Sequence, residues 1–265
     1  MNLFLREMKS NRKSLIMWCI GMLFMVAAGM GKYSGYESSG QSVNEILAGI
    51  PDSLKAVIGF GDFDMSKAMG FYGMLFSYLI IMAAIHATII GATIISKEER
   101  DKTAEFLFVK PLSRFSAVFA KLSAACLNVF VLNLVTFTVS CMMVGNYSKN
   151  EPYMRDILNL MLGMLAIQLI FMLAGSAIAA AGKKPKSAAS AASGIMLTAY
   201  VLDKVIDLNK NLDFLKYLTP FKYFSAANLL GDTGFETVFV VLSAIIVSIF
   251  LYVTFVFYRK RDLSI

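Results

Sequence analysis

The stretch ILNLMLGMLAIQLIFMLAGSAIAAA occupies residues 157–181 and contains no charged side chain. A helix that crosses the roughly 30 Å hydrocarbon core of a bilayer needs about 20 mostly apolar residues. This stretch exceeds that length. A single water-facing core cannot hide so long an apolar run, so the sequence predicts a transmembrane helix here.

The rest of the chain has the same character. Of its 265 residues, 57% are hydrophobic and only 16% are charged, whereas soluble domains average about 45–50% and about 25%. The mean hydropathy is +0.65. Helices satisfy their own backbone hydrogen bonds inside a bilayer, so we expect an all-α integral membrane protein.

Six stretches meet or approach the length that a span requires. They are residues 14–31, 69–95, 115–144, 157–181, 187–202 and 237–258. The fifth is short. We treat the whole chain, residues 1–265, as a single transmembrane domain. Residues 1–13 mix apolar and basic side chains, which fits a short amphipathic helix in the membrane interface; a simple positively charged flank is the alternative.

Lysine and arginine are unevenly distributed among the connecting segments. If the N-terminus is cytoplasmic, fifteen of the 25 lie on the cytoplasmic side and nine lie outside; Lys121, at the start of the third span, is counted on neither side. Cytoplasmic loops carry an excess of these residues. The asymmetry predicts a multi-pass protein of the cell membrane with both termini in the cytoplasm. It also accounts for the net charge of +7 without a nucleic-acid partner.

Several function classes lack their characteristic residues in this sequence. The spans hold no carboxylate near a midplane, where ion-coupled transporters normally need one. No Gly-x-x-x-x-Gly-Lys-Ser/Thr loop is present to cradle a phosphate, and no nucleophile stands beside a histidine in a suitable motif. The cysteines Cys19, Cys126 and Cys141 have no metal-ligand spacing, and His86 is the single histidine. We therefore expect no enzyme, no metal and no cofactor in this chain, and any transport work must draw energy from a partner.

Uncharged polar residues inside spans most simply form interhelical hydrogen bonds. They are His86, Thr88, Asn128, Asn133, Gln168 and Ser176. Small residues cluster at 174–182 and 187–194. Such clusters let helices approach closely, either within the chain or at a dimer seam or sliding face.

The two longest outside segments are not plain loops. Apolar residues recur at helical spacing over 43–58, and Pro51 divides that pattern. Residues 203–236 are rich in aromatics and too polar to span. A segment of that kind can dip into the membrane where protein covers its backbone.

The first cytoplasmic loop, residues 96–114, reads SKEERDKTAEFLFVKPLSR. Its first part alternates charges, and Glu98 and Lys102 have the i,i+4 spacing of a helical ion pair. An apolar group around Phe106 follows, and Pro111 ends the pattern. The loop fits either a rigid charged lever that docks into a groove or an ordinary solvated hairpin.

This loop resembles the one between spans two and three in the permease subunits of type-2 ABC exporters. The resemblance rests on Glu-Glu-Arg at 98–100, Thr103, Glu-Phe-Leu at 105–107 and Pro-Leu-Ser-Arg at 111–114. It extends over the N-terminal helix, the six spans, the apolar helix around residues 47–60, the Leu-Thr-Pro-Phe-Lys-Tyr-Phe segment at 218–224 and a short basic tail. One departure is Lys110, where the family often has an apolar or small residue before the proline.

The resemblance implies that the loop is the coupling helix, which contacts a separate P-loop ATPase subunit carrying ATP and Mg. The coupling residues would be Glu98, Glu99, Arg100, Thr103, Glu105, Phe106, Leu107 and Pro111. A second permease chain, identical or related, would complete the membrane part within the lipid bilayer.

The apolar spans suit a hydrophobic or amphipathic cargo, such as a peptide antibiotic or a lipid-like molecule. Two alternatives stay open. One is a non-transporting membrane adaptor or immunity protein of the same fold, and the other is a membrane enzyme.

Overall fold

The computed structural model describes residues 3–39, 63–103, 113–148, 151–231 and 234–260, together with residues 49, 51 and 55. The side chains of residues 36–39 and 210 are not included. Every regular element in these ranges is a helix. The elements are α1 (Leu3–Ser39), α4 (Ala68–Arg100), α6 (Arg114–Tyr147), α7 (Met154–Ala181), η1 (Pro185–Ser187), α8 (Ala188–Leu208), η2 (Lys210–Leu218), α9 (Pro220–Tyr223), α10 (Ala226–Leu230) and α11 (Thr237–Lys260).

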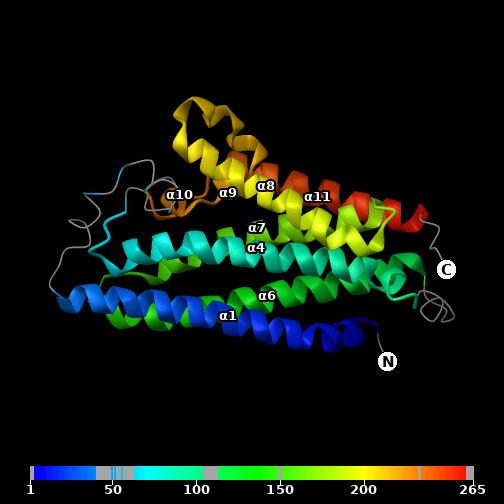
Figure 1. Cartoon of the computed structure of the whole chain (residues 1–265), viewed down its shortest axis with the longest axis horizontal. Coiled ribbons are helices and arrows are strands. Elements are labelled where there is room, and N and C mark those ends of the chain that lie inside the picture. Colours follow the sequence, from blue (N-terminus) through cyan, green and yellow to red (C-terminus); the bar gives the residue numbers. More distant parts are fainter. Residues whose placement is uncertain are drawn as a thin grey trace.

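Six helices within the described ranges are long and apolar enough to cross a membrane, which confirms the all-α membrane fold. They are α1, α4, α6, α7, α8 and α11, and they run side by side along the long axis of the molecule (Figure 1). Five of the predicted spans fall inside one of these helices, and the remaining one, 187–202, begins one residue before α8. The predicted outside helix at 43–58 lies almost wholly beyond the described residues.

Arg100, Arg114 and Lys260 lie at one end of the bundle, which we call the loop end. The first residues of α1 lie there too (Figure 1). The described ends of the chain are therefore on the same side, as six crossings require. That this side is the cytoplasm stays a prediction.

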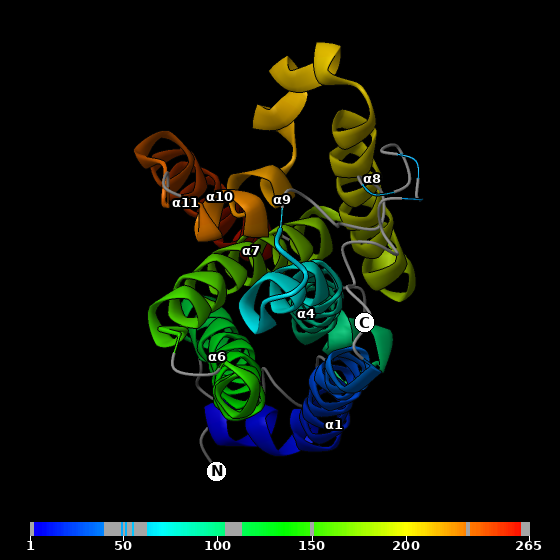
Figure 2. The ribbon, with the colours of Figure 1, turned by 90° about the vertical axis from the view of Figure 1, so that its left-hand side faces the viewer.

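α4 and α7 form the centre of the bundle (Figure 2). In their most apolar windows 72% and 67% of the residues are buried, against 17% in both α1 and α11. Glycines allow this close approach. A Cβ on Gly91 of α4 would lie 1.9 Å from the carbonyl oxygen of Met172, and one on Gly175 of α7 would lie 2.5 Å from that of Thr88.

Three of the polar residues expected to bond between helices do so around this centre. Ser176 Oγ donates to the Gly91 carbonyl at 3.2 Å. Asn133 Nδ2 of α6 donates to Gln168 Oε1 of α7 at 3.2 Å and to the Met161 carbonyl at 3.1 Å. These bonds satisfy polar groups that lipid would leave without partners.

The two runs of small residues differ in their surroundings. The first lies in the α4–α7 contact around Gly175. In the second, Ala188 and Ala192 are buried, whereas Ser190, Ala191 and Gly194 are exposed on α8. A dimer seam along these exposed residues of α8 stays a prediction.

The predicted N-terminal interfacial helix and first span form one continuous helix, α1. Its first turns, dark blue in Figure 2, run across the loop end beneath α6 before the helix follows the bundle axis. Packing holds them there, because Leu3 is buried against Ala117 of α6. The N-terminal residues therefore belong to the bundle instead of forming a separate element.

At the opposite end, η2, α9 and α10 connect α8 to α11 (Figure 2). α10 contacts the ends of α4 and α7, α9 contacts α7, and η2 packs on α8 and α9. Phe221 of α9 packs on Phe171 of α7, with ring centroids 5.1 Å apart. Leu229 of α10 fits where Gly163 provides space, since a Cβ there would lie 2.6 Å from it. The later part of the aromatic segment 203–236 thus packs on the bundle, whereas Phe214 and Leu218 of η2 are exposed. That the segment dips into the membrane stays a prediction.

Candidate functional site

The last turn of α4 carries the first predicted coupling residues. α4 continues unbroken from the apolar core through Ile94 and Ile95 to Arg100. It stops in a Schellman motif, in which the Thr103 N–H donates to the Glu98 carbonyl at 2.8 Å and the Lys102 N–H donates to the Glu99 carbonyl at 3.3 Å. Lys102 takes the left-handed conformation with φ 54°. The charged stretch is therefore the end of a core helix.

The predicted helical ion pair between Glu98 and Lys102 is wrong. Lys102 lies past the end of α4 and is exposed. Glu98 instead turns inward, where its carboxylate pairs with Lys121 of α6 and accepts from Arg6 Nη2 of α1 at 3.1 Å. A buried ammonium without a counter-ion is far more costly than an exposed one, and this cost favours the inward pairing.

Five side chains from three helices form what we call the buried charge cluster: Arg6, Glu7, Lys97, Glu98 and Lys121. Glu7 accepts from Arg6 at 3.1 Å and from Lys97 Nζ at 2.9 Å. Lys121 Nζ also donates to the Ile94 carbonyl at 2.8 Å. Glu7 and Lys121 have no exposed surface. Three cations and two carboxylates leave the cluster with a formal charge of +1.

The cluster joins the C-terminal end of α4 to α1 and α6. Arg6 Nη2 contacts carboxylates of both α1 and α4, and Lys97 Nζ reaches back to Ser10 Oγ of α1 at 3.0 Å. Lys121 fixes the same end of α4 to α6. A displacement of the loop must therefore move the ends of all three helices together or break buried ion pairs.

The structure places the predicted coupling residues in two different environments. Glu98 and Glu99 are buried. Arg100 and Thr103 are exposed at the loop end, and the Arg100 guanidinium, which bonds to Asp101 at 2.9 Å, holds the pKa of that carboxyl below its ordinary value. The remaining four, Glu105, Phe106, Leu107 and Pro111, lie outside the described residues.

The loop re-enters the bundle at α6. Ser113 is the N-cap, and its hydroxyl accepts from the Ser116 N–H at 3.1 Å. The next residue, Arg114, donates to the carbonyl of Arg259 at the end of α11 at 2.8 Å. Both ends of the loop are thus attached to fixed positions on the bundle.

Sequence reasoning missed Arg6, Glu7, Lys97 and Lys121 as site residues. A usable pattern existed for Lys121, because a lone cation inside an apolar span requires a partner in the bundle interior. Because Lys121 lies at the start of the third predicted span, the sequence assigns it to neither side of the membrane and indicates no partner for it. The partner itself depends on how α4 meets α6, which the local sequence does not encode.

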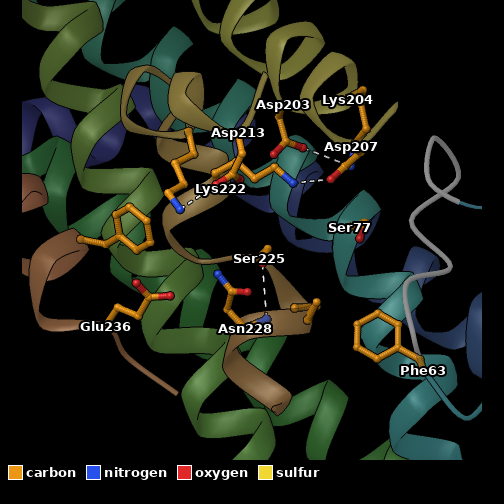
Figure 3. A pocket seen from close by; sticks show the side chains of 14 residues that line it. Phe63, Ser77, Asp203, Lys204, Asp207, Asp213, Lys222, Ser225, Asn228 and Glu236 are labelled. Carbon is orange, nitrogen blue, oxygen red and sulfur yellow. Dashed lines mark hydrogen bonds and ion pairs between the residues drawn. The ribbon is translucent and has the colours of Figure 1, made fainter. Parts of the chain in front are cut away.

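A second polar region lies at the opposite end, around a cavity of about 360 Å³. Figure 3 shows Asp203, Lys204 and Asp207 from α8 on one wall, with Lys222 of α9 reaching Asp207. Lys204 Nζ lies 3.1 Å from Asp203 and 3.2 Å from Asp207. These ion pairs attach the aromatic segment to the end of α8.

No group of three or more His, Cys, Asp or Glu side chains suited to a metal ion occurs in the part of the chain that the structure describes. At the loop end, buried ion pairs fix the helix ends beside an exposed charged turn.

The comparisons with known proteins agree with this picture. A family model described as ABC-2 family transporter protein matches residues 1–263. No curated protein matches the chain.

Proposed function

The chain belongs to the ABC-2 family of transporter proteins, and from that premise we propose that it is the membrane-spanning subunit of an ATP-driven exporter. A separate P-loop ATPase subunit binds at the loop end and holds ATP and Mg. Two membrane chains, identical or related, enclose the path. The protein resides in the cell membrane with both termini in the cytoplasm.

The observation that carries this proposal is the direct continuation of the most buried helix, α4, into the exposed turn at Arg100 and Thr103. Force applied to this turn reaches the centre of the bundle through one rigid helix. The buried charge cluster adds α1 and α6 to the moving body. ATP-driven closure of the partner would thus bias a two-state membrane interface.

The coupling residues divide into two roles under this proposal. Arg100, Thr103 and the undescribed residues Glu105, Phe106, Leu107 and Pro111 supply contacts to the ATPase. Glu98 and Glu99 are buried, so they act as positioning residues that keep the loop aligned with the bundle.

The proposed cargo is a hydrophobic or amphipathic compound, such as a peptide antibiotic or a lipid-like molecule. Support comes from the apolar character of all six long helices, whose mean hydropathy over the best window runs from 1.3 to 2.7. An apolar cargo can move along such surfaces without the cost of desolvating charges.

The first test is purification of the tagged protein from its own cell in mild detergent, with the associated proteins identified by mass spectrometry. We expect a P-loop ATPase to accompany the wild type. The double variant Phe106→Ala/Leu107→Ala should lose at least about tenfold of it, equivalent to about 1.4 kcal/mol. Arg155→Ala, an exposed cation near the start of α7, is the control at the opposite end and should retain it.

A transport assay distinguishes the exporter hypothesis from the alternative of a non-transporting adaptor or immunity protein. The complex would be reconstituted in vesicles with the ATPase outside, and uptake of a labelled amphipathic peptide and of a fluorescent phospholipid would be followed with and without ATP. Uptake that depends on ATP and on the P-loop lysine of the partner is expected. A chain that purifies without any ATPase refutes coupling, and a stable complex that moves neither probe favours the adaptor.

A further inference from the structure

A groove of about 190 Å³ lies at the loop end between the first turns of α6 and the last turns of α11. Its floor contains Phe115 and Phe255, whose rings stack with centroids 4.9 Å apart. Val118, Tyr252 and Val256 complete its apolar lining. We call it the α6–α11 groove.

The groove opens on the outer surface of the bundle. Phe115 is 65% exposed and Tyr252 is 70% exposed. Both belong to helices that are long and apolar enough to span a membrane. Lipid tails are as apolar as these side chains, so the lining of the groove suits an acyl chain.

Two arginines stand at the rim of this apolar groove. Arg114 and Arg259 are among its lining residues, and the rest of the lining is uncharged. The Arg114 side chain donates to the backbone carbonyl of Arg259, which holds the start of α6 next to the end of α11. The Arg259 side chain is exposed, and Lys260 follows it. A bidentate guanidinium suits a phosphate oxygen pair.

We propose that the α6–α11 groove binds one anionic phospholipid of the bilayer, with an acyl chain in the groove and the phosphate at Arg259 and Arg114. Charge complementarity selects this occupant: the charged side chains that line the groove among the described residues are both cations, which favours an anionic headgroup over a zwitterionic one. Basic sites between helices at a membrane surface are a recognised form of lipid-headgroup recognition.

The bound lipid would touch the machinery of the loop end. Tyr258 is a buried wall of the groove, and Lys121 Nζ of the buried charge cluster lies 6.0 Å from the centroid of its ring. Arg114 is the first residue of α6 and directly follows the loop. Occupancy therefore stabilises the arrangement in which α11, α6 and the charge cluster are locked together. The proposal does not depend on an ATPase.

The test compares lipid retention by native mass spectrometry after purified protein is exchanged with phosphatidylglycerol or phosphatidylcholine. The wild type should retain phosphatidylglycerol at least about tenfold more strongly. Arg259→Gln keeps the backbone carbonyl and should abolish that preference. Arg155→Gln removes the same charge at the opposite end and should leave the preference unchanged.

A second variant separates the groove from general surface charge. Val256→Trp fills the groove and leaves every cation in place, so it should lower phosphatidylglycerol retention as much as Arg259→Gln does. Circular dichroism melting confirms that each variant is folded. Equal retention of the two lipids by the wild type overturns the proposal. If Val256→Trp leaves phosphatidylglycerol retention unchanged, or if millimolar inorganic phosphate displaces the lipid, the proposal is overturned in favour of a simple anion-attracting surface.

Discussion

Replacing Glu98 by glutamine should be among the most destabilising single changes at the loop end, and removing Lys121 as well should reverse most of the damage. Glu98 pairs with the completely buried Lys121 and with Arg6. Glu98→Gln raises the formal charge of the buried charge cluster from +1 to +2 and leaves the Lys121 ammonium without a carboxylate. Breaking one partner of a buried pair typically costs about 3–5 kcal/mol.

The Lys121→Met variant should cost less, because Glu98 keeps Arg6 as its partner at 3.1 Å. We expect about 1–3 kcal/mol, the cost of a buried acceptor that loses one donor. The double variant Glu98→Gln/Lys121→Met restores the charge of +1 and should cost no more than Lys121→Met alone. The predicted coupling is then at least about 3–5 kcal/mol, well above the limit of about 0.5 kcal/mol within which independent changes add.

Thermal unfolding in detergent, followed by circular dichroism, measures this cycle. At about 2–4 °C per kcal/mol for a chain of this size class, Glu98→Gln should lower Tm by roughly 10 °C, and the double variant should recover most of it. The pair Lys67–Glu151, 3.2 Å apart with both side chains at least half exposed, is the control cycle and should couple by less than about 1 kcal/mol. If the losses in Tm caused by Glu98→Gln and by Lys121→Met simply add in the double variant, the buried pairing is refuted.

Two further predictions use the same unfolding measurement. Gly91→Ala should lower stability by about 1–3 kcal/mol, because its Cβ would lie 1.9 Å from the Met172 carbonyl oxygen; Gly194→Ala, with nothing within 4 Å, should be neutral or stabilising, and equal effects of the two would contradict the close α4–α7 contact. Lys102→Gly should raise stability by up to about 1 kcal/mol, because glycine accepts φ 54° without steric cost, and a lower Tm would show that the Lys102 side chain makes a contact of its own.

The six long helices follow directly from the sequence, since each requires only an uninterrupted apolar stretch of sufficient length. The fifth boundary shows the limit of that reasoning. The predicted span stops at residue 202 because charged residues follow, yet α8 continues to Leu208. Asp203, Lys204 and Asp207 remain helical because they pair with one another and with Lys222. Hydropathy counts the cost of placing each charged residue in a membrane. It does not include the stabilisation that the residue gains from a partner of opposite charge.

The same limit explains why the candidate site was only partly predictable. The resemblance identified Glu98 and Glu99 as important positions. Without knowledge of their partners, however, hydropathy assigns charged residues to the loop next to the span. The structure puts them inside because α4 ends at Arg100, several residues later than residue 95, where the predicted span ends. Lys121 pairs with Glu98, and Glu7 with Lys97, only when α1, α4 and α6 converge. Glu7 and Lys97 lie 90 positions apart in the sequence.

The buried charge cluster is better explained by a role in fixing the relative positions of the helix ends than by a contribution to the stability of the fold. Buried ion pairs often stabilise a fold no more than apolar side chains of similar size would, so a chain this rich in apolar residues has a simpler way to hold three helix ends together. Apolar contacts, however, tolerate sliding, whereas ion pairs between Glu98, Lys121 and Arg6 are satisfied in one arrangement. Less than two turns deeper, Gly91 of α4 touches the backbone of α7. A loop fixed in this way to α4 transmits a small displacement to the centre of the bundle with little loss, which is what coupling to a distant ATPase requires.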